Sequence, residues 1–316
     1  MQEICSELHS LLSRAVARKR SDCISLSGGL DSSILASLIG EKKFPAYCMV
    51  AGDFPYTDLV HAQHVAKLYG LDLTVISASV DDLLAAIDGA IRILGVFNPI
   101  EIRNNIVVFM AMERAKKDGL KHIMTGDGAD ELFAGYNFFR RMSPMDLEKD
   151  LERIWRVMHF PSKKISESIG TVLCSPFLDD AIISFAKSVP AELKVREENG
   201  QTWGKWILRK AFENSLPPTV VWREKAAMQD GSGTGGLTRF FDELVPDMVF
   251  FEKAKNYLQN EQVALQSKEA LHYYEVYRKY GDYPALLGES ETRCPFCKYS
   301  VEKGANFCRM CGSYPL

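Results

Sequence analysis

The sequence contains no long apolar run and carries almost no net charge. A membrane-spanning helix needs about 18 consecutive apolar residues. No stretch of the 316-residue sequence approaches that length. The first residues, MQEICSELHSLLSRAVARK, begin acidic and build no apolar run, unlike a signal peptide. A formal net charge of −3 removes any global argument for binding nucleic acid or an anionic membrane. We therefore expect a cytoplasmic protein with no membrane partner.

Cysteine is sparse outside the tail. Cys5, Cys23, Cys48 and Cys174 lie far apart, in or near apolar sequence. Without a secretory signal, cysteines placed in this way are usually reduced core residues. The other four of the eight cysteines fall in the last 23 residues, which sets the tail apart from the rest of the chain.

Short apolar runs alternate with helical patterns in the first half of the chain. After a helix over 1–20, strands are predicted at 23–27, 45–52, 71–78 and 121–126, and helices at 32–40, 57–70, 80–94 and 103–118. This alternation predicts an α/β fold, a doubly wound parallel sheet with helices on both faces. Ligands bind such sheets beyond the carboxyl ends of the strands.

The second half of the chain is predicted to be mainly helical over 140–285. Its helical segments are 144–158, 179–188, 202–215, 237–250 and 264–280. A glycine-rich loop, WREKAAMQDGSGTGG, interrupts them at 222–236. We expect one large domain over 1–285, a polar linker over 281–292 and a small C-terminal domain over 286–316.

The tail carries a metal-ligand pattern, Cys294-x2-Cys297-x10-Cys308-x2-Cys311. Two C-x-x-C pairs can present four thiolates to one Zn²⁺ in a closed, structural, tetrahedral site, so we predict a zinc ribbon. The alternatives are two disulfides or four free thiols. Such a short segment has no core of its own, so metal binding would supply its folding free energy. Its four basic side chains fit either contact with RNA or a solvated surface; they are Arg293, Lys298, Lys303 and Arg309.

A glycine-rich turn follows the first predicted strand. The candidate nucleotide-binding residues there are Leu26, Ser27, Gly28, Gly29, Leu30, Asp31, Ser32 and Ser33. Glycines let a phosphate approach the backbone N–H groups of a helix N-terminus, and serine hydroxyls add donors. Asp31 would repel phosphate unless a cation lies between them, and Mg²⁺ can bridge carboxylates and phosphate oxygens. The alternative is an ordinary tight turn.

A second carboxylate-bearing turn, TGDGADELF, spans 125–133 and follows the fourth predicted strand. We expect Asp130 to share the magnesium ion with Asp31, and Asp127 to face the reacting centre. The alternative, a charged first helical turn, accounts for Asp130 and Glu131 but not for the glycines that flank Asp127.

Six segments together resemble the synthetase domain of asparagine synthetases, within the PP-loop ATP pyrophosphatases of the adenine nucleotide alpha hydrolase-like fold. The resemblance covers roughly residues 20–285. In chain order the segments are SGGLDSS (27–33), FNPIEIRNN (97–105), TGDGADELFAGY (125–136), PFLDD (176–180), GKWILRKAFENSLPPTVVWREKAAMQDGSG (204–233) and SKEALHYYEVYRKY (267–280).

This resemblance implies that ATP adenylates a carboxylate with release of pyrophosphate, and that ammonia then attacks the acyl-adenylate. The implied cofactors are ATP and Mg²⁺, and aspartate is the favoured acid. Asp127 would act at the reacting centre, and Lys225, Arg103 and Lys205 would neutralise developing negative charge. The further nucleotide-binding residues that the resemblance implies are Val50, Thr125, Gly126, Gly128 and Asp130.

The chain also departs from this family. We expect no glutamine-hydrolysing domain, since only 26 residues precede Ser27. We therefore expect the chain to use free ammonia, a partner amidotransferase or a different nucleophile. Asp127 replaces the family's usual glutamate, and Val172-Leu173-Cys174 replaces its Glu-x-Arg. Cys174 is then a small apolar filler or a reactive thiol.

Other hypotheses remain open from the sequence alone. His61 and His64 form an H-x-x-H pair that could bind a metal, although surface or packing histidines fit it better. A PP-loop enzyme that adenylates a tRNA base is an alternative function, with the ribbon binding RNA or a partner protein. A non-catalytic nucleotide-binding adaptor is the third.

Overall fold

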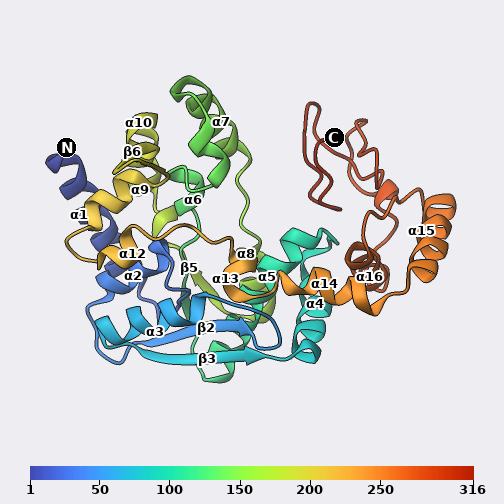
Figure 1. The fold of residues 1–316 in the computed structure, drawn as a ribbon, viewed down its shortest axis with the longest axis horizontal. Helices are drawn as coiled ribbons and strands as arrows, with labels where there is room; N and C mark the ends of the chain where they lie inside the picture. The colour runs from blue at the N-terminus through green and yellow to red at the C-terminus, as the bar shows by residue number, and fades with distance from the viewer. The chain divides into compact units, whose positions relative to one another are not determined.

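The computed structural model describes residues 1–316 (Figure 1). The chain divides into two compact units. Unit 1 comprises Met1–Met49, Thr57–Ile76 and Ala111–Ala227, and unit 2 comprises Val50–Tyr56, Ser77–Met110 and Met228–Leu316. The predicted boundary near residue 285 lies within unit 2 and stays a prediction.

A five-stranded sheet forms the centre of the α/β fold. Its strand order is β3-β2-β1-β4-β5, and its strands are β1 (Cys23–Ser25), β2 (Pro45–Ala51), β3 (Asp72–Ala78), β4 (His122–Met124) and β5 (Val172–Cys174). β1 pairs in parallel with β2 and with β4, and Ile24 lies opposite both Ala46 and Met124. Figure 1 shows β2 and β3 side by side. The predicted doubly wound parallel sheet is confirmed, with its topological switch point between β1 and β4.

Helices of unit 1 cover this sheet and position the loops at its carboxyl edge. They are α1 (Gln2–Lys19), α2 (Leu30–Ile39), α3 (Asp58–Tyr69), α6 (Ala129–Leu132), α7 (Pro144–Val157), α8 (Pro161–Ile169), α9 (Asp180–Ser188), α10 (Ala191–Lys194), α11 (Trp206–Phe212) and α12 (Pro218–Val221). α1 packs against α2, α9 and α11 through fully buried residues such as Leu8 and Leu12. Leu147 and Leu151 of α7 pack with Ala134, which follows α6.

The predicted helix over 202–215 is wrong at its start. Residues Gln201–Trp203 form strand β7, which pairs antiparallel with β6 (Arg196–Glu198). Asn199 and Gly200 join the two strands, with φ of 54° and 78°. Asn-Gly is the preferred pair for a two-residue hairpin turn, where both residues need positive φ. The helix α11 therefore begins only after this hairpin.

Unit 2 contains α4 (Val80–Leu94), α13 (Met228–Ser232), α14 (Gly236–Leu244), α15 (Asp247–Glu261) and α16 (Lys268–Tyr277), and α5 (Pro99–Lys117) begins in it. α16 packs against α14 and α4. The predicted single helix over 237–250 is wrong, because α14 ends before Val245 and α15 begins after Pro246. Proline disfavours a helical residue before it, and Val245 is extended with φ −98° and ψ 115°.

No single helix combines the length and apolarity needed to cross a membrane. α4 and α5 reach those limits only when they are taken together, and they are bent by 106° at the break between them.

Candidate active site

The turn between β1 and α2 leaves the N-terminus of α2 open. α2 begins at Leu30 after the N-cap residue Gly29, and no side chain caps it. The first backbone N–H groups of a helix have no partner within the helix, and the helix dipole makes them attractive to anions. The sequence-predicted phosphate position therefore has the donors it needs.

Gly28 fixes the path of this turn. Its φ is +70°, and an added Cβ would lie 2.3 Å from the backbone carbon of His61 in α3. Ser27 Oγ accepts a hydrogen bond from the backbone N–H of Gly29 at 3.2 Å and lies 3.2 Å from Ser32 Oγ. These contacts shape the turn from inside, and only glycine fits at position 28.

The two predicted turns meet. A Cβ added at Gly126, in the turn after β4, would lie 2.9 Å from Asp31 Cβ. Gly128, the N-cap residue of α6, has φ +94°, so the chain reverses sharply and brings Asp130 toward Asp31. Both turns follow strands at the switch point of the sheet, the usual place for a ligand in this architecture.

Four charged side chains form the centre of the site, which we call the carboxylate–lysine cluster: Asp31, Asp130, Lys205 and Lys225. Lys205 Nζ lies 2.5 Å from Asp31 Oδ2 and 2.7 Å from Asp130 Oδ1. Lys225 Nζ lies 2.5 Å from Asp130 Oδ1. Three separate parts of unit 1 thus converge: the first turn of α2, α6, and the segment around α11 and α12.

Burial and charge set different proton affinities for the two carboxylates. Burial raises the pKa of Asp31; Lys205 opposes this shift, and the charge of Asp130 adds to it. Burial opposes the ionisation of Asp130 too, but Lys205 and Lys225 together hold the pKa of Asp130 well below its usual range. Burial lowers the pKa of Lys205, yet the two carboxylates outweigh it and raise that pKa overall. Asp130 is therefore the more firmly ionised carboxylate.

The cluster also fits a bound magnesium ion. Asp31 Oδ1 is buried and has no hydrogen-bond partner, which leaves one carboxylate oxygen available to a cation. Mg²⁺ prefers oxygen ligands and usually takes one or two carboxylates together with phosphate oxygens. Asp31 and Asp130 together supply that donor set.

Lys205 reaches the cluster from an unusual backbone conformation. Its φ is +53°, a left-handed value that is costly for a residue with a side chain. Its backbone N–H donates to Phe133 O at 3.0 Å. A Cβ at the neighbouring Gly204 would lie 2.4 Å from Ala134 O, and one at Gly135 would overlap Asp130 Oδ1. Close backbone packing with the segment after α6 therefore directs the Lys205 ammonium to the two carboxylates.

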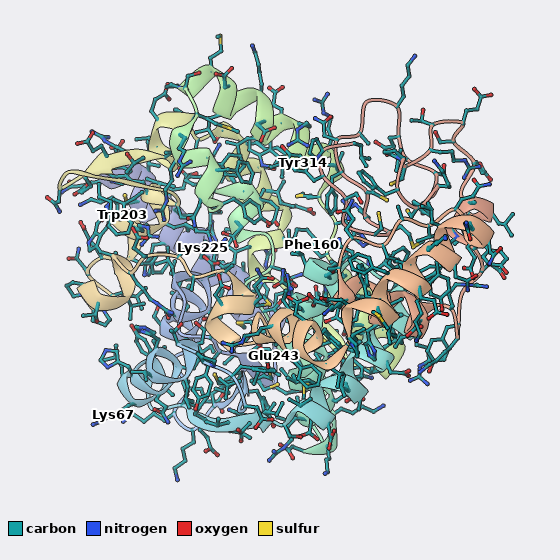
Figure 2. The ribbon with its side chains drawn as sticks, turned by 45° about the vertical axis from the view of Figure 1, so that its right-hand side comes forward. Lys67, Phe160, Trp203, Lys225, Glu243 and Tyr314 are labelled. Atoms are coloured by element: carbon teal, nitrogen blue, oxygen red, sulfur yellow. The ribbon has the colours of Figure 1, made fainter.

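Lys225 lies after α12 on a segment without regular secondary structure (Figure 2). Its ammonium group sits 4.6 Å from the centroid of the Tyr136 ring, a cation–π distance. The Tyr136 hydroxyl donates to Glu131 Oε1 at 2.5 Å. On the same segment, Arg223 donates to Gly28 O at 3.4 Å and to Asp58 Oδ1 at 3.2 Å. These contacts attach the lysine-bearing segment to both turns of the site.

Asp127 is held by hydroxyl groups. Its Oδ2 accepts a hydrogen bond from Ser162 Oγ at 2.6 Å and another from Thr125 Oγ1 at 3.0 Å. Burial raises the pKa of Asp127, and the two hydroxyls oppose that shift. A carboxylate with a raised pKa suits the exchange of a proton at a reacting centre.

Two predicted residues lie in unit 2. Arg103, on α5, donates to Glu269 Oε2 at 2.7 Å and to Gln229 Oε1 at 3.1 Å, and also to Thr238. These contacts give Arg103 a structural role within unit 2, and its predicted charge-neutralising role stays a prediction. Val50 is buried near the end of the strand β2.

The remaining candidates are packing or surface residues. Cys174 is buried at the end of β5, and its Sγ lies 3.3 Å from Lys19 O. Burial raises the pKa of the Cys174 thiol, which disfavours the thiolate form that a nucleophile requires. The apolar-filler interpretation therefore describes Cys174. His61 packs its backbone against Gly28, and His64 is exposed.

The tail cysteines are arranged as zinc ligands. Their four sulfur atoms all lie within 4.8 Å of one another. Cys294 and Cys311 have sulfurs 3.8 Å apart, and Cys297 and Cys308 have sulfurs 3.7 Å apart. A tetrahedral site with Zn–S bonds of about 2.3 Å places sulfurs about 3.8 Å apart, whereas a disulfide needs about 2.0 Å. The donor set fits Zn²⁺.

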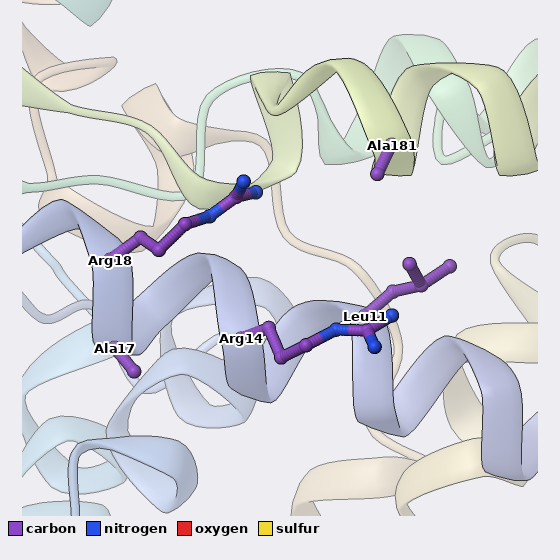
Figure 3. Close-up of a pocket in the computed structure, with 5 residues that line it drawn as sticks. All are labelled: Leu11, Arg14, Ala17, Arg18 and Ala181. Atoms are coloured by element: carbon purple, nitrogen blue, oxygen red, sulfur yellow. The ribbon is translucent and has the colours of Figure 1, made fainter.

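A separate cavity lies on unit 1. It measures about 390 Å³ and is lined by Leu11, Arg14, Ala17 and Arg18 of α1 and by Ala181 of α9. Figure 3 shows the two arginines extending along α1 on the side that faces Ala181. None of the predicted site residues lines this cavity.

Three residues of the site were not predicted individually: Tyr136, Ser162 and Arg223. Tyr136 and Arg223 lie inside the quoted segments TGDGADELFAGY and WREK, so their positions in those motifs were the available signal. Ser162 follows Pro161 at the start of α8, and nothing in its local sequence marks it, because its partner Asp127 is distant in the chain.

A family model described as asparagine synthase matches residues 7–156 and 146–279. The chain belongs to the asparagine synthase family. Among curated relatives, the asparagine synthetase [glutamine-hydrolyzing] of Gallus gallus is 29% identical over 288 residues, which cover 84% of this chain and 50% of that protein. The nodule asparagine synthetase [glutamine-hydrolyzing] of Pisum sativum is 28% identical over 279 residues, covering 81% and 47%. The chain thus spans about half the length of the curated relatives it matches.

One solved structure resembles the chain only distantly. The NMN synthetase from Francisella tularensis aligns with a TM-score of 0.39 and 14% identity, over 92% of this chain and 98% of that chain. Membership of the asparagine synthase family supports the use of ATP by this chain.

Proposed function

We propose that the chain activates a small carboxylic acid as an acyl-adenylate and then forms an amide with ammonia. ATP supplies the adenylyl group, so the bond between its α- and β-phosphates breaks and pyrophosphate leaves. The ammonia nitrogen then displaces AMP from the acyl carbon and loses a proton. Aspartate is the favoured acid, because the family match and the two curated relatives point to asparagine formation.

The turn before α2 and the two aspartates would bind the triphosphate. Backbone N–H groups at the start of α2, with the hydroxyls of Ser27 and Ser32, would contact the pyrophosphate. Asp31 and Asp130 would hold Mg²⁺, which when bound supplies positive charge to the phosphate oxygens. Asp31 Oδ1, buried and unpartnered, is the observation that supports this assignment.

Lys205 and Lys225 would stabilise the leaving group. Both ammonium groups already lie within 2.7 Å of Asp130, so they are fixed before negative charge develops on pyrophosphate. Preorganised cations of this kind are worth more than mobile ones, since they pay no reorganisation cost during the reaction.

Asp127 would serve the second half-reaction. Its raised pKa suits a carboxylate that accepts a proton from the attacking nitrogen.

We also propose that the nitrogen arrives as free ammonia or from an amidotransferase. In this proposal, residues 1–285 form the synthetase domain and residues 286–316 form a zinc ribbon. The protein would act in the cytoplasm.

One observation carries the proposal: the carboxylate–lysine cluster lies at the switch point of a parallel sheet in a chain of this family. The test is a screen for pyrophosphate release with Mg²⁺, ATP and single carboxylic acids including aspartate, with and without ammonium. Release should require an acid, and ammonium should produce the amide. Release that requires tRNA and no acid would contradict the proposal.

A further inference from the structure

The cysteine-rich tail packs directly against the start of α5, within unit 2. The backbone N–H of Phe97 donates to Met310 O at 2.9 Å. A Cβ added at Gly312 would lie 2.4 Å from Asn98 Oδ1. Met310 and Gly312 flank Cys311, a predicted zinc ligand, so the two residues that precede α5 contact the ribbon beside the metal position.

A second contact attaches the ribbon to the segment before α16. The backbone N–H of Ala264 donates to Phe296 O at 2.7 Å, between Cys294 and Cys297. Phe97 also contacts α16 directly, because the centroid of its ring lies 4.8 Å from that of Tyr274 on this helix. The ribbon therefore contacts two segments of unit 2, the one before α5 and the one before α16.

The residues held by the ribbon begin α5 and lead to Arg103. Asn98 caps this helix, since its Oδ1 accepts from the backbone N–H of Ile100 at 3.1 Å and of Glu101 at 3.4 Å. Arg103 follows about one helical turn later, where it pairs with the buried Glu269 at 2.7 Å. Movement of Asn98 would change the direction in which α5 presents Arg103.

The charges of the ribbon do not favour a nucleic-acid surface. Two of its four basic side chains are used internally, since Arg293 donates to Leu287 O and Lys298 to Pro295 O. Four thiolates on Zn²⁺ leave two negative charges, and the tail also carries Glu289, Glu291 and Glu302. The zinc-loaded ribbon is therefore slightly acidic, and phosphate backbones bind to clusters of positive charge.

We propose that the zinc ribbon is an internal, metal-dependent support that holds the Phe97–Arg103 segment of unit 2 in place. Bound Zn²⁺ would fix the backbone on both sides of Cys311, and that backbone binds Phe97 and contacts Asn98. Loss of zinc would unfold the ribbon and release the start of α5.

The test compares hydrogen exchange in the full chain with zinc, after zinc removal by a chelator, and after zinc is added back. The amides of Phe97 and Ala264 are the probes, because each donates to a ribbon carbonyl. Zinc removal should accelerate exchange at both by at least about tenfold, and zinc should restore it. Amides of β4 in unit 1 serve as the internal control and should not change. Unchanged exchange at Phe97 without zinc would overturn the proposal.

Two glycine variants separate the contact from the metal. Gly312→Ala inserts a methyl group against Asn98, whereas Gly304→Ala meets nothing within 4 Å, and both glycines have φ near +80°. Both variants should retain one zinc per chain by metal analysis. Gly312→Ala alone should accelerate exchange at Phe97. Equal effects of the two variants would overturn the role of the Asn98 contact.

Discussion

Lys205 joins two carboxylates from a buried position and a left-handed backbone conformation. Its side chain is 5% exposed, while those of Asp31 and Asp130 are 22% and 24% exposed. When the charge of Lys205 is removed, Lys225 is the one ammonium group left in the cluster for the two carboxylates of Asp31 and Asp130. Breaking a buried ion pair in this way is far more costly than losing a surface pair.

Lys205→Met should therefore lower the free energy of unfolding by about 3–5 kcal/mol, measured by urea denaturation. Lys210→Met, on the helix α11 that Lys205 precedes, is the matched control. Lys210 pairs with Glu213 nearer the surface, so its loss should cost about 1 kcal/mol or less. Similar costs for the two variants would show that Lys205 does not bridge the carboxylates.

Ser162 lowers the pKa of Asp127 by hydrogen bonding to its ionised form. Ser162→Ala removes this bond, so the pKa of Asp127 should rise further. If Asp127 must be ionised to accept a proton, the acid limb of the pH profile for amide formation should move to higher pH. A hydrogen bond to a charged group is worth about 1.5–3 kcal/mol, so we expect a shift of about one to two pH units.

The matched control for this shift is Ser168→Ala, because Ser168 lies exposed on the same helix α8. Its pH profile should coincide with that of the unchanged chain. A Ser162→Ala profile that loses rate equally at every pH would mean that Ser162 supports folding rather than the ionisation of Asp127.

At the scale of elements, Gly28 and Gly40 flank the same helix α2 with nearly equal φ values of +70° and +68°. Alanine at either position costs about 1–2 kcal/mol of backbone strain. At Gly28 the added Cβ would also overlap the backbone of α3, whereas at Gly40 it meets nothing within 4 Å. Only Gly28→Ala should displace the phosphate turn.

Acid-dependent ATP–pyrophosphate exchange should consequently fall by about 100-fold or more in Gly28→Ala, since displacing a binding group by about 1 Å has effects of that size. Gly40→Ala should retain exchange within about threefold. An active Gly28→Ala variant would mean that this turn does not bind the phosphates.

The elements that could be predicted are those with a local signal. β2 and α4 have apolar spacing and capping patterns that reproduce their bounds almost to the residue. The break before Pro246 and the Asn199-Gly200 hairpin also have local signals, but the helical spacing of neighbouring residues masked them. The strand β5, Val172–Cys174, was not predicted. β1 and β4 are equally short, but a glycine-rich turn after each of them marks its end, and no such turn follows β5.

Long-range partners could not be predicted. Asp31 and Lys205 are 174 residues apart, and Arg103 and Glu269 are 166 apart. The chemistry of the motifs suggested a shared site for Asp31 and Asp130, which the structure places around one ammonium group. The sequence gives no reason to expect that Arg103 pairs with the buried Glu269, because only the tertiary packing brings these two residues together.

At the scale of the whole molecule, charge separates the proposed function from its nucleic-acid alternative. The chain has a net charge of −3, and its zinc-loaded ribbon is slightly acidic. Binding of labelled tRNA, followed by fluorescence anisotropy at about 150 mM salt, should be no tighter than the non-specific range of about 10⁻⁴–10⁻⁶ M. Saturable binding in the nanomolar range, lost in Cys308→Ser, would instead favour an RNA substrate.

We propose that this site activates a carboxylic acid as its adenylate. Exchange of labelled pyrophosphate into ATP measures that half-reaction directly, and the sample needs only the chain, Mg²⁺, ATP and one acid. Asp31→Asn should abolish the exchange, while Asp150→Asn, a surface ion-pair residue on α7, should preserve it. We predict exchange that requires an acid, with aspartate the most effective. Exchange that proceeds without any acid, or that survives in Asp31→Asn, would contradict the claim.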